Sequence, residues 1–151
     1  MNTAELRTIL VVEDDPADQV LIQEAFEEHE ETRRSRPNLL LAWDGEQALD
    51  ILFRRGAHAQ ATRPDLVILD LNLPKYDGRA VLEQIKSDLE LRTIPVVVFS
   101  TSSQDEDIVG TYRLHANAFV TKPTGFDDFT AVVHQIQEFF TRTARLPAPA
   151  A

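Results

Sequence analysis

The chain has 151 residues, of which 43% are hydrophobic and 26% are charged, a balance typical of one globular domain. Its 15 basic and 25 acidic residues give a net charge of −10, which argues against nucleic acid or an anionic membrane surface as a partner. Cysteine is absent, which excludes disulfides and thiolate chemistry, and no apolar run approaches the roughly 20 residues of a membrane span, so we expect a cytoplasmic protein.

Short apolar segments predict five strands, at residues 9–12, 38–43, 66–69, 96–99 and 118–120. These segments are continuously apolar rather than alternating, which is typical of parallel strands covered by helices on both faces. Longer amphipathic segments separate them, so the chain reads as (βα)₅. The predicted fold class is therefore α/β, a doubly wound five-stranded parallel sheet, for which a common strand order is 2-1-3-4-5.

Helix start signals lie between the predicted strands. Asp15 and Pro16 form an N-cap followed by proline at the first helical position. Asp44 to Gln47 and Ser103 to Glu106 have the spacing of a capping box. The remaining helices are expected to open at Asp77 and at Thr124 or Gly125.

The last helix is predicted to run from Phe126 to about Thr141. Residues 1–141 are therefore predicted to form one domain. The tail from Arg142 to Ala151 is rich in proline and alanine and is predicted to be disordered. Since so little chain follows the helix, we expect no separate output domain and expect output through protein contacts of the domain itself.

Polar residues follow four of the strands, at the edge of the sheet where parallel strands end. The first strand is followed by Glu13 and Asp14, the third by Asp70, the fourth by Ser100 and the fifth by Lys122. Ligands of doubly wound sheets bind beyond the carboxyl ends of the strands, and strands one and three are neighbours in the expected order. We therefore expect the three carboxylates to share one small volume.

Three neighbouring carboxylates raise one another's pKa values unless a cation neutralises them. Mg²⁺, a hard cation that prefers oxygen ligands and keeps several waters, suits such a site. Asp70 then remains as a candidate nucleophile toward a phosphoryl group, because carboxylates form acyl phosphates. Ser100 and Lys122 are the hydroxyl and the cation available for the phosphoryl oxygens.

Each of these residues also has an ordinary structural interpretation. Asp14 alone is typical of a helix cap, Asp70 of a turn, and Lys122 of a solvated charge. Their occurrence at successive strand ends favours a single site over coincidence. Trp43, at the end of the second strand, is expected to pack against the protein rather than to stack on a ligand.

The chain resembles the receiver domain of two-component response regulators from Thr8 to about Phe140. The resemblance rests on four segments, 9–15, 69–78, 95–100 and 120–123. It implies a flavodoxin-like receiver fold and a signalling role rather than a metabolic enzyme. A sensor histidine kinase would donate a phosphoryl group in a Mg²⁺-dependent reaction.

The resemblance also implies the metal ligands and the acceptor. Glu13 and Asp14 would form the acidic pair, with glutamate where aspartate is commoner, and Asp70 would be the phosphoacceptor and a third ligand. Asn72 would offer Mg²⁺ its backbone carbonyl.

A second group of residues would respond to the phosphoryl group. Ser100 would be the switch hydroxyl, although Thr101 follows it directly and leaves a one-residue ambiguity. Phe119 would be the switch aromatic residue, in place of the commoner tyrosine. Lys122 would contact the phosphoryl group and would form a cis peptide with Pro123.

A narrower similarity, to small receivers paired with phytochromes, rests on residues 63–78 and 100–102. It implies a light-regulated histidine kinase as the donor. Two other functions remain open, a degenerate receiver acting as a scaffold and a phosphohydrolase with an aspartate nucleophile. The intact set of polar strand-end residues argues against the scaffold, and Asn72, which has no proton to give, argues against the hydrolase.

The apolar residues of the last helix span an arc of roughly 140°. A helix that covers only its own core needs an apolar stripe of about 100°. The excess lies near Val132 and Phe139, and exposed apolar surface of this kind marks interfaces. We therefore predict a homodimer through this helix, with packing of Phe139 onto the tail or the core as the alternative.

Overall fold

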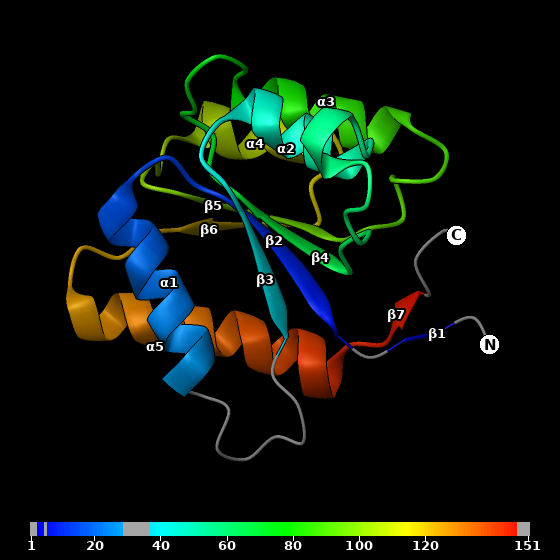
Figure 1. Ribbon diagram of the computed structural model, residues 1–151. Coiled ribbons are helices and arrows are strands. Elements are labelled where there is room, and N and C mark those ends of the chain that lie inside the picture. The colour runs from blue at the N-terminus through cyan, green and yellow to red at the C-terminus, as the bar shows by residue number, and fades with distance from the viewer. Residues whose placement is uncertain (1–2, 5, 29–36, 148–151) are drawn as a thin grey trace.

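The computed structural model describes residues 3–4, 6–28 and 37–147 (Figure 1). One parallel sheet contains β2 (Thr8–Val12), β3 (Asn38–Ala42), β4 (Leu66–Leu69), β5 (Val96–Ser100) and β6 (Ala118–Thr121). The strand order is β3-β2-β4-β5-β6. Because β1 lies outside this sheet, the order equals 2-1-3-4-5 for the five predicted strands, and the predicted flavodoxin-like fold is confirmed.

Helices cover both faces of the sheet (Figure 1). One face carries α1 (Pro16–Glu28) and α5 (Phe126–Glu138), and the other carries α2 (Gly45–Leu52), α3 (Gly78–Ser87) and α4 (Asp105–Arg113). Side chains of β2 alternate between two cores: Ile9 packs with the α1 and α5 side and Leu10 with the α2 and α3 side. Burial on both faces explains why the strands are continuously apolar. None of the helices in the described residues has the length and apolar character needed to cross a membrane.

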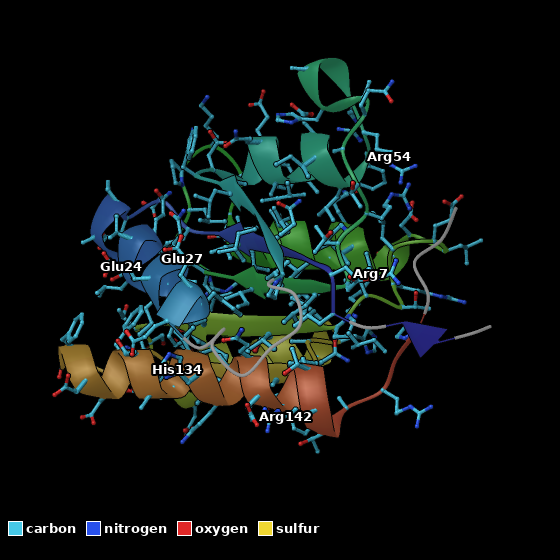
Figure 2. The ribbon with its side chains drawn as sticks, turned by 60° about the horizontal axis from the view of Figure 1, so that its bottom comes forward. Arg7, Glu24, Glu27, Arg54, His134 and Arg142 are labelled. Atoms are coloured by element: carbon cyan, nitrogen blue, oxygen red, sulfur yellow. The ribbon has the colours of Figure 1, made fainter. Side chains whose placement is uncertain are left out.

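The helices α1 and α5 pack side by side beneath the sheet, as Figure 2 shows from below. His134 of α5 donates a hydrogen bond from Nε2 to the Ala25 carbonyl oxygen of α1 at 2.9 Å. Phe99 of β5 packs on Phe129 of α5 with 5.2 Å between ring centroids. These contacts tie the first and last helices together beside the strand that ends at Ser100.

Three of the predicted helix caps are present. Asp15 accepts from the Ala17 N–H at 2.9 Å, Asp44 from the Gln47 N–H at 2.7 Å, and Asp77 from the Arg79 N–H at 2.8 Å. The cap predicted at Ser103 is wrong, because α4 begins at Asp105 with Gln104 at its N-cap. Ser102, one residue earlier than predicted, accepts from the Gln104 N–H and donates to Asp107 Oδ2, so this serine holds the start of the helix.

The C-terminal segment differs from the predicted disordered tail. After α5 the chain makes a π-helical turn, Phe139–Thr143, and then β7 (Leu146–Pro147), which pairs antiparallel with β1 (Thr3–Ala4). Leu146 is 3% exposed and packs in the core beneath the sheet. Burial of Leu146 favours an ordered conformation of this segment, although its proline and alanine neighbours have a weak preference for regular structure. The composition of the segment did not indicate this burial. Residues 148–151 of the predicted tail lie outside the described residues.

Trp43 also differs from the prediction, because its side chain is 54% exposed. It follows β3, which is an edge strand with only one neighbouring strand. Its backbone N–H donates to Gln47 Oε1 at 3.0 Å, so the residue completes the start of α2. The edge position explains why the indole ring lacks the cover that was expected.

Gly78 allows the loop after β4 to pack tightly on the start of α3. A Cβ atom at this position would lie 2.2 Å from the Asp70 carbonyl oxygen and 2.7 Å from the Leu71 Cα. We therefore expect Gly78→Ala to lower the free energy of unfolding by about 1–3 kcal/mol, the range for overpacking.

The matched control is Gly110→Ala in α4, where an added Cβ meets nothing within 4 Å. Because alanine is the better helix former, this change should raise the free energy of unfolding by about 0.5–1 kcal/mol. Urea unfolding of both variants measures the two effects. Equal stability of Gly78→Ala and the parent chain would contradict the packing argument.

Candidate functional site

Three carboxylates meet beyond the carboxyl ends of β2 and β4. These strands pair with Val12 opposite Leu69, so the residues that follow them are adjacent. Carboxylate oxygens of Glu13, Asp14 and Asp70 all lie within 4.8 Å of one another. Glu13 and Asp70 are buried and Asp14 is exposed. The structure thus brings these three residues together as the strand order predicted.

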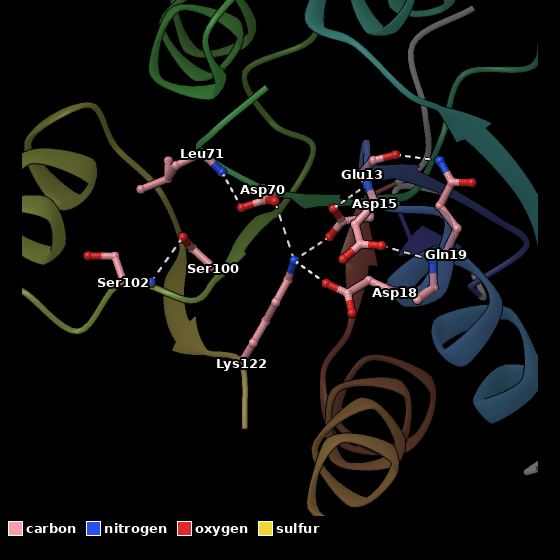
Figure 3. A network of polar contacts seen from close by, with 10 residues as sticks. Glu13, Asp15, Asp18, Gln19, Asp70, Leu71, Ser100, Ser102 and Lys122 are labelled. Atoms are coloured by element: carbon pink, nitrogen blue, oxygen red, sulfur yellow. Dashed lines mark hydrogen bonds and ion pairs between the residues drawn. The ribbon is translucent and has the colours of Figure 1, made fainter. Parts of the chain in front are cut away.

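Backbone contacts hold the two buried carboxylates in place (Figure 3). The Glu13 N–H donates to the Ala42 carbonyl at 2.9 Å, and Glu13 Oε2 accepts from the Asp15 N–H at 3.1 Å. Asp70 Oδ1 accepts from the Leu71 N–H at 2.8 Å. The second oxygen of each carboxylate faces Lys122, so each carboxylate has one oxygen held by the backbone and one in the site.

Lys122 enters the same volume from the end of β6. Its backbone N–H donates to the Ser100 carbonyl at 2.7 Å, which continues the pairing of β5 and β6. Its ammonium contacts Glu13 Oε1, Asp18 Oδ2 at 2.8 Å and Asp70 Oδ2 at 3.3 Å. The Lys122 side chain is only 4% exposed, so these ion pairs lie in a poorly solvated environment.

Burial acts on the charges of this cluster in two directions. Burial alone would lower the pKa of Lys122, but its hydrogen bonds to Asp18 and Glu13 outweigh that effect and raise the pKa, so the ammonium stays charged. Burial raises the pKa of Glu13 to about 7, although Lys122 opposes the shift. One ammonium therefore does not compensate the buried acidic group completely.

The donor set fits a divalent cation. Oxygen atoms of Glu13, Asp14 and Asp70 are hard ligands, and their proximity without a cation is electrostatically unfavourable. Asp14 is exposed, which suits a shallow site in which the ion keeps several waters. Asn72 lies two residues beyond Asp70 and is exposed, and the role of its backbone carbonyl stays a prediction.

The hydroxyl at the site is positioned by the end of β5. Ser100 is the last residue of this strand and is fully buried, whereas Thr101 is exposed. Ser100 Oγ accepts from the Ser102 N–H at 3.3 Å. Burial at the strand end therefore favours Ser100 over Thr101 as the candidate hydroxyl, and its role as the switch hydroxyl stays a prediction.

Phe119 lies on β6, close in the chain to Lys122. Its side chain is half-buried and packs against the core beneath α2 and α3. Its backbone N–H donates to the Tyr112 hydroxyl of α4 at 3.2 Å. Phe119 thus connects the strand that leads to Lys122 with α4, and its role as a switch stays a prediction.

The predicted cis peptide between Lys122 and Pro123 is wrong. None of the peptide bonds in the described part of the chain is cis. A trans bond is the preferred form even before proline.

Sequence reasoning missed Asp18, which contacts Lys122 at 2.8 Å. It lies in the first turn of α1, where an acidic residue is normally explained by the helix dipole. Its contact is with a residue 104 positions away, so the residues next to Asp18 in the sequence do not indicate it. Figure 3 shows Asp18 on the same side of Lys122 as Glu13, and Ser100 on the other side in this view.

Comparison with known proteins identifies close relatives. Residues 9–134 match the response regulator receiver domain family. The response regulator Rcp1 of Synechocystis is 40% identical over 94% of both chains. The probable methanogenesis regulatory protein FilR2 of Methanothrix harundinacea is 42% identical, over 94% of this chain and 88% of its own.

A solved structure shows the same similarity in three dimensions. The phosphorylated cyanobacterial phytochrome response regulator RcpA is 44% identical, with a TM-score of 0.90 over 96% of this chain and all of its own. Rcp1 has been solved in a Mn²⁺-bound form that superimposes with a TM-score of 0.87. The similarity therefore covers the whole fold as well as the strand ends.

Proposed function

Because the chain belongs to the response regulator receiver domain family, we propose that it accepts a phosphoryl group on Asp70 from a sensor histidine kinase. The observation that carries this proposal is the convergence of Glu13, Asp14 and Asp70, with the Lys122 ammonium 3.3 Å from Asp70 Oδ2. Asp70 Oδ1 is engaged by the Leu71 N–H, so Oδ2 is the oxygen we assign as nucleophile.

In the proposed reaction, Asp70 Oδ2 forms a bond to phosphorus as the phosphorus–nitrogen bond to the kinase histidine breaks. The imidazole leaves with the electron pair of that bond. Lys122 and the Ser100 hydroxyl would then each donate to a phosphoryl oxygen. A bound Mg²⁺, held by Glu13, Asp14, Asp70 and the Asn72 carbonyl, would supply neutralisation of phosphoryl charge.

The proposed signal starts from the hydroxyl. In this structure Ser100 Oγ accepts a hydrogen bond from the Ser102 N–H at 3.3 Å. When the Ser100 side chain turns toward a phosphoryl oxygen, this hydrogen bond breaks. Ser102 also bonds Asp107 of α4, and Asp107 is paired with Arg79 of α3 at 2.7 Å. A change at Ser100 would therefore be felt at the start of α4 and, through Tyr112, at Phe119.

We propose a phytochrome-type histidine kinase as the donor. The proposal is supported by the 44% identity to RcpA, a phytochrome response regulator, over nearly the whole chain. FilR2 is 42% identical to this chain and is named for the regulation of methanogenesis, so sequence similarity alone does not select the kinase. The partner therefore has to be tested directly. Phosphotransfer from a set of purified kinases, including a phytochrome, decides this: preferential labelling of the chain by the phytochrome is expected, and labelling only by other kinases contradicts it.

The function itself is tested with acetyl phosphate and Mg²⁺. We expect the intact mass to increase by one phosphoryl group, in an adduct sensitive to base and hydroxylamine. A scaffold without receiver chemistry would gain no phosphoryl group. A phosphohydrolase would instead turn over a generic phosphate ester continuously. That reaction needs a general acid, and Asn72, two residues after Asp70, has no proton to give.

We also propose that the chain forms a homodimer through α5 and the turn that follows it. Phe139 is 49% exposed and lines a groove of about 560 Å³ together with Val132, Val120 and Ala118. Val132 is half-buried and packs against the core, so it contributes less free surface than the helical arc suggested. The groove borders β6, which is an edge strand, and an apolar surface beside an open edge favours a second copy of the chain as its partner.

Sedimentation velocity at micromolar concentration tests this dimer. We expect a dimer that Phe139→Glu converts to a monomer, because a charge cannot be buried unpaired at an interface. The matched control is Leu89→Glu, since Leu89 is 76% exposed and lies outside the groove. A chain that stays monomeric with and without beryllofluoride contradicts the dimer, and a dimer insensitive to Phe139→Glu places the interface elsewhere.

A further inference from the structure

The three N–H donors of the Lys122 ammonium are all engaged by carboxylates. Their acceptors are Glu13 Oε1, Asp18 Oδ2 at 2.8 Å and Asp70 Oδ2 at 3.3 Å. An ammonium group has three donors, so this arrangement leaves no donor for a further ligand. A phosphoryl oxygen can therefore bind Lys122 only if one of these carboxylates gives way.

Asp18 differs from the other two acceptors. Glu13 belongs to the proposed metal site and Asp70 is the proposed acceptor, so both change partners when the site is loaded. Asp18 lies in the first turn of α1, where the helix dipole stabilises its negative charge. It is also 0.5 Å closer to the ammonium than Asp70, from distances of 2.8 and 3.3 Å.

The direction of the contact matters as well. In Figure 3, α1 and Asp18 lie to the right of Lys122, whereas Ser100 lies to its left. The proposed phosphoryl group has to reach both Ser100 and Lys122. Asp18 therefore draws the ammonium toward α1 and away from the side on which Ser100 lies.

We propose that Asp18 is a positioning residue that holds Lys122 on the α1 side of the site and competes with the phosphoryl group for its ammonium. The inference rests on the proposed function, because it requires a phosphoryl group on Asp70. Glu13 and Asp70 release the ammonium when the site is loaded, so Asp18 is the one of the three carboxylates that still holds it. Movement of Lys122 toward the phosphoryl group breaks this remaining ion pair and releases the first turn of α1. The contact thus stabilises the unphosphorylated state selectively, which shifts the equilibrium between the two states.

Removal of a carboxylate affects the binding of Mg²⁺ and the binding of a phosphoryl mimic in opposite directions. Loss of a nearby negative charge weakens the attraction of the site for Mg²⁺, whichever carboxylate is removed. Loss of a competitor for Lys122 instead strengthens the binding of a phosphoryl mimic once Mg²⁺ is saturating. Because the mimic is an anion, loss of any nearby negative charge also favours its binding, so the competition is measured as the excess tightening over a variant that loses an equal charge without a contact to Lys122.

The experiment is a calorimetric titration of beryllofluoride at saturating Mg²⁺ into the parent chain, Asp18→Asn and Asp15→Asn. Asp15 is the matched control because it is exposed, and its accepted bond from the Ala17 N–H is one that asparagine keeps. We expect Asp18→Asn to bind about two- to fivefold more tightly, as for loss of one partly exposed ion pair. Asp15→Asn, which changes only the general field, should tighten binding clearly less than Asp18→Asn does.

A second measurement follows the backbone amides of residues 16–19 by nuclear magnetic resonance. Beryllofluoride should shift these resonances in the parent chain, as the contact with Asp18 breaks, and should shift them less in Asp18→Asn. Urea unfolding of both variants verifies that they are folded.

Unchanged or weaker beryllofluoride binding by Asp18→Asn overturns the inference, and so does an equal tightening in Asp15→Asn. Equal amide shifts in the parent chain and Asp18→Asn overturn it too. Failure of the parent chain to bind beryllofluoride at all is a different result, since it overturns the proposed function as well.

Discussion

Asp70→Asn is expected to abolish phosphoryl uptake from acetyl phosphate. The amide oxygen carries no charge and is a poor nucleophile, while the shape of the side chain and the bond from the Leu71 N–H are retained. The contact with Lys122, at 3.3 Å in the parent chain, is weakened but the fold should remain intact. Intact mass after incubation with acetyl phosphate and Mg²⁺ measures the effect.

Asp77→Asn is the control for Asp70→Asn. Asp77 lies in the same loop and accepts from the Arg79 N–H as the cap of α3, a role that asparagine also fills. This variant should take up one phosphoryl group at the parent rate. Phosphorylation of Asp70→Asn at that same rate would show that the acceptor lies elsewhere.

Asp14→Ala is expected to weaken Mg²⁺ binding and thereby to abolish phosphorylation. Two unit charges about 4 Å apart interact by roughly 4 kcal/mol at an effective dielectric constant of 20, and Mg²⁺ carries two charges, but hydration of the exposed Asp14 offsets most of this attraction. A net loss above about 1.4 kcal/mol corresponds to a Mg²⁺ affinity lowered by more than about tenfold. Because Asp14 is exposed and repels Glu13 and Asp70, the unliganded fold should be as stable as the parent or more stable.

Calorimetric titration with Mg²⁺ and urea unfolding in its absence measure the two effects of Asp14→Ala. Asp15→Asn serves as the control, because it removes a neighbouring charge that is not part of the acidic cluster. An Mg²⁺ titration of Asp14→Ala that matches the parent chain would rule out this site for the ion.

Much of the site could be predicted because parallel strands end at one edge of a sheet. The apolar runs that became β2 and β4 located Glu13, Asp14 and Asp70, and a common strand order made them neighbours. The same reasoning located Ser100 at the end of β5 and Lys122 at the end of β6. Each of these positions depends only on local periodicity and on topology, both of which a single chain reveals.

Other features depended on contacts between distant segments. The ion pair of Lys122 with Asp18 spans 104 positions, and no local pattern distinguishes Asp18 from an ordinary acidic residue of a first helical turn. The order of the C-terminal segment depended on burial of Leu146, and the exposure of Trp43 depended on β3 being an edge strand.

The amino-acid pattern by itself was thus sufficient for the fold class and for the residues that follow the strands at the site, since these follow from periodicity and from the strand ends. Only the tertiary structure decided which partners the Lys122 ammonium holds and that its peptide bond to Pro123 is trans. Such choices depend on positions differing by a fraction of an ångström and on which neighbours exclude water. Those quantities are set by packing of the whole domain rather than by any segment of it.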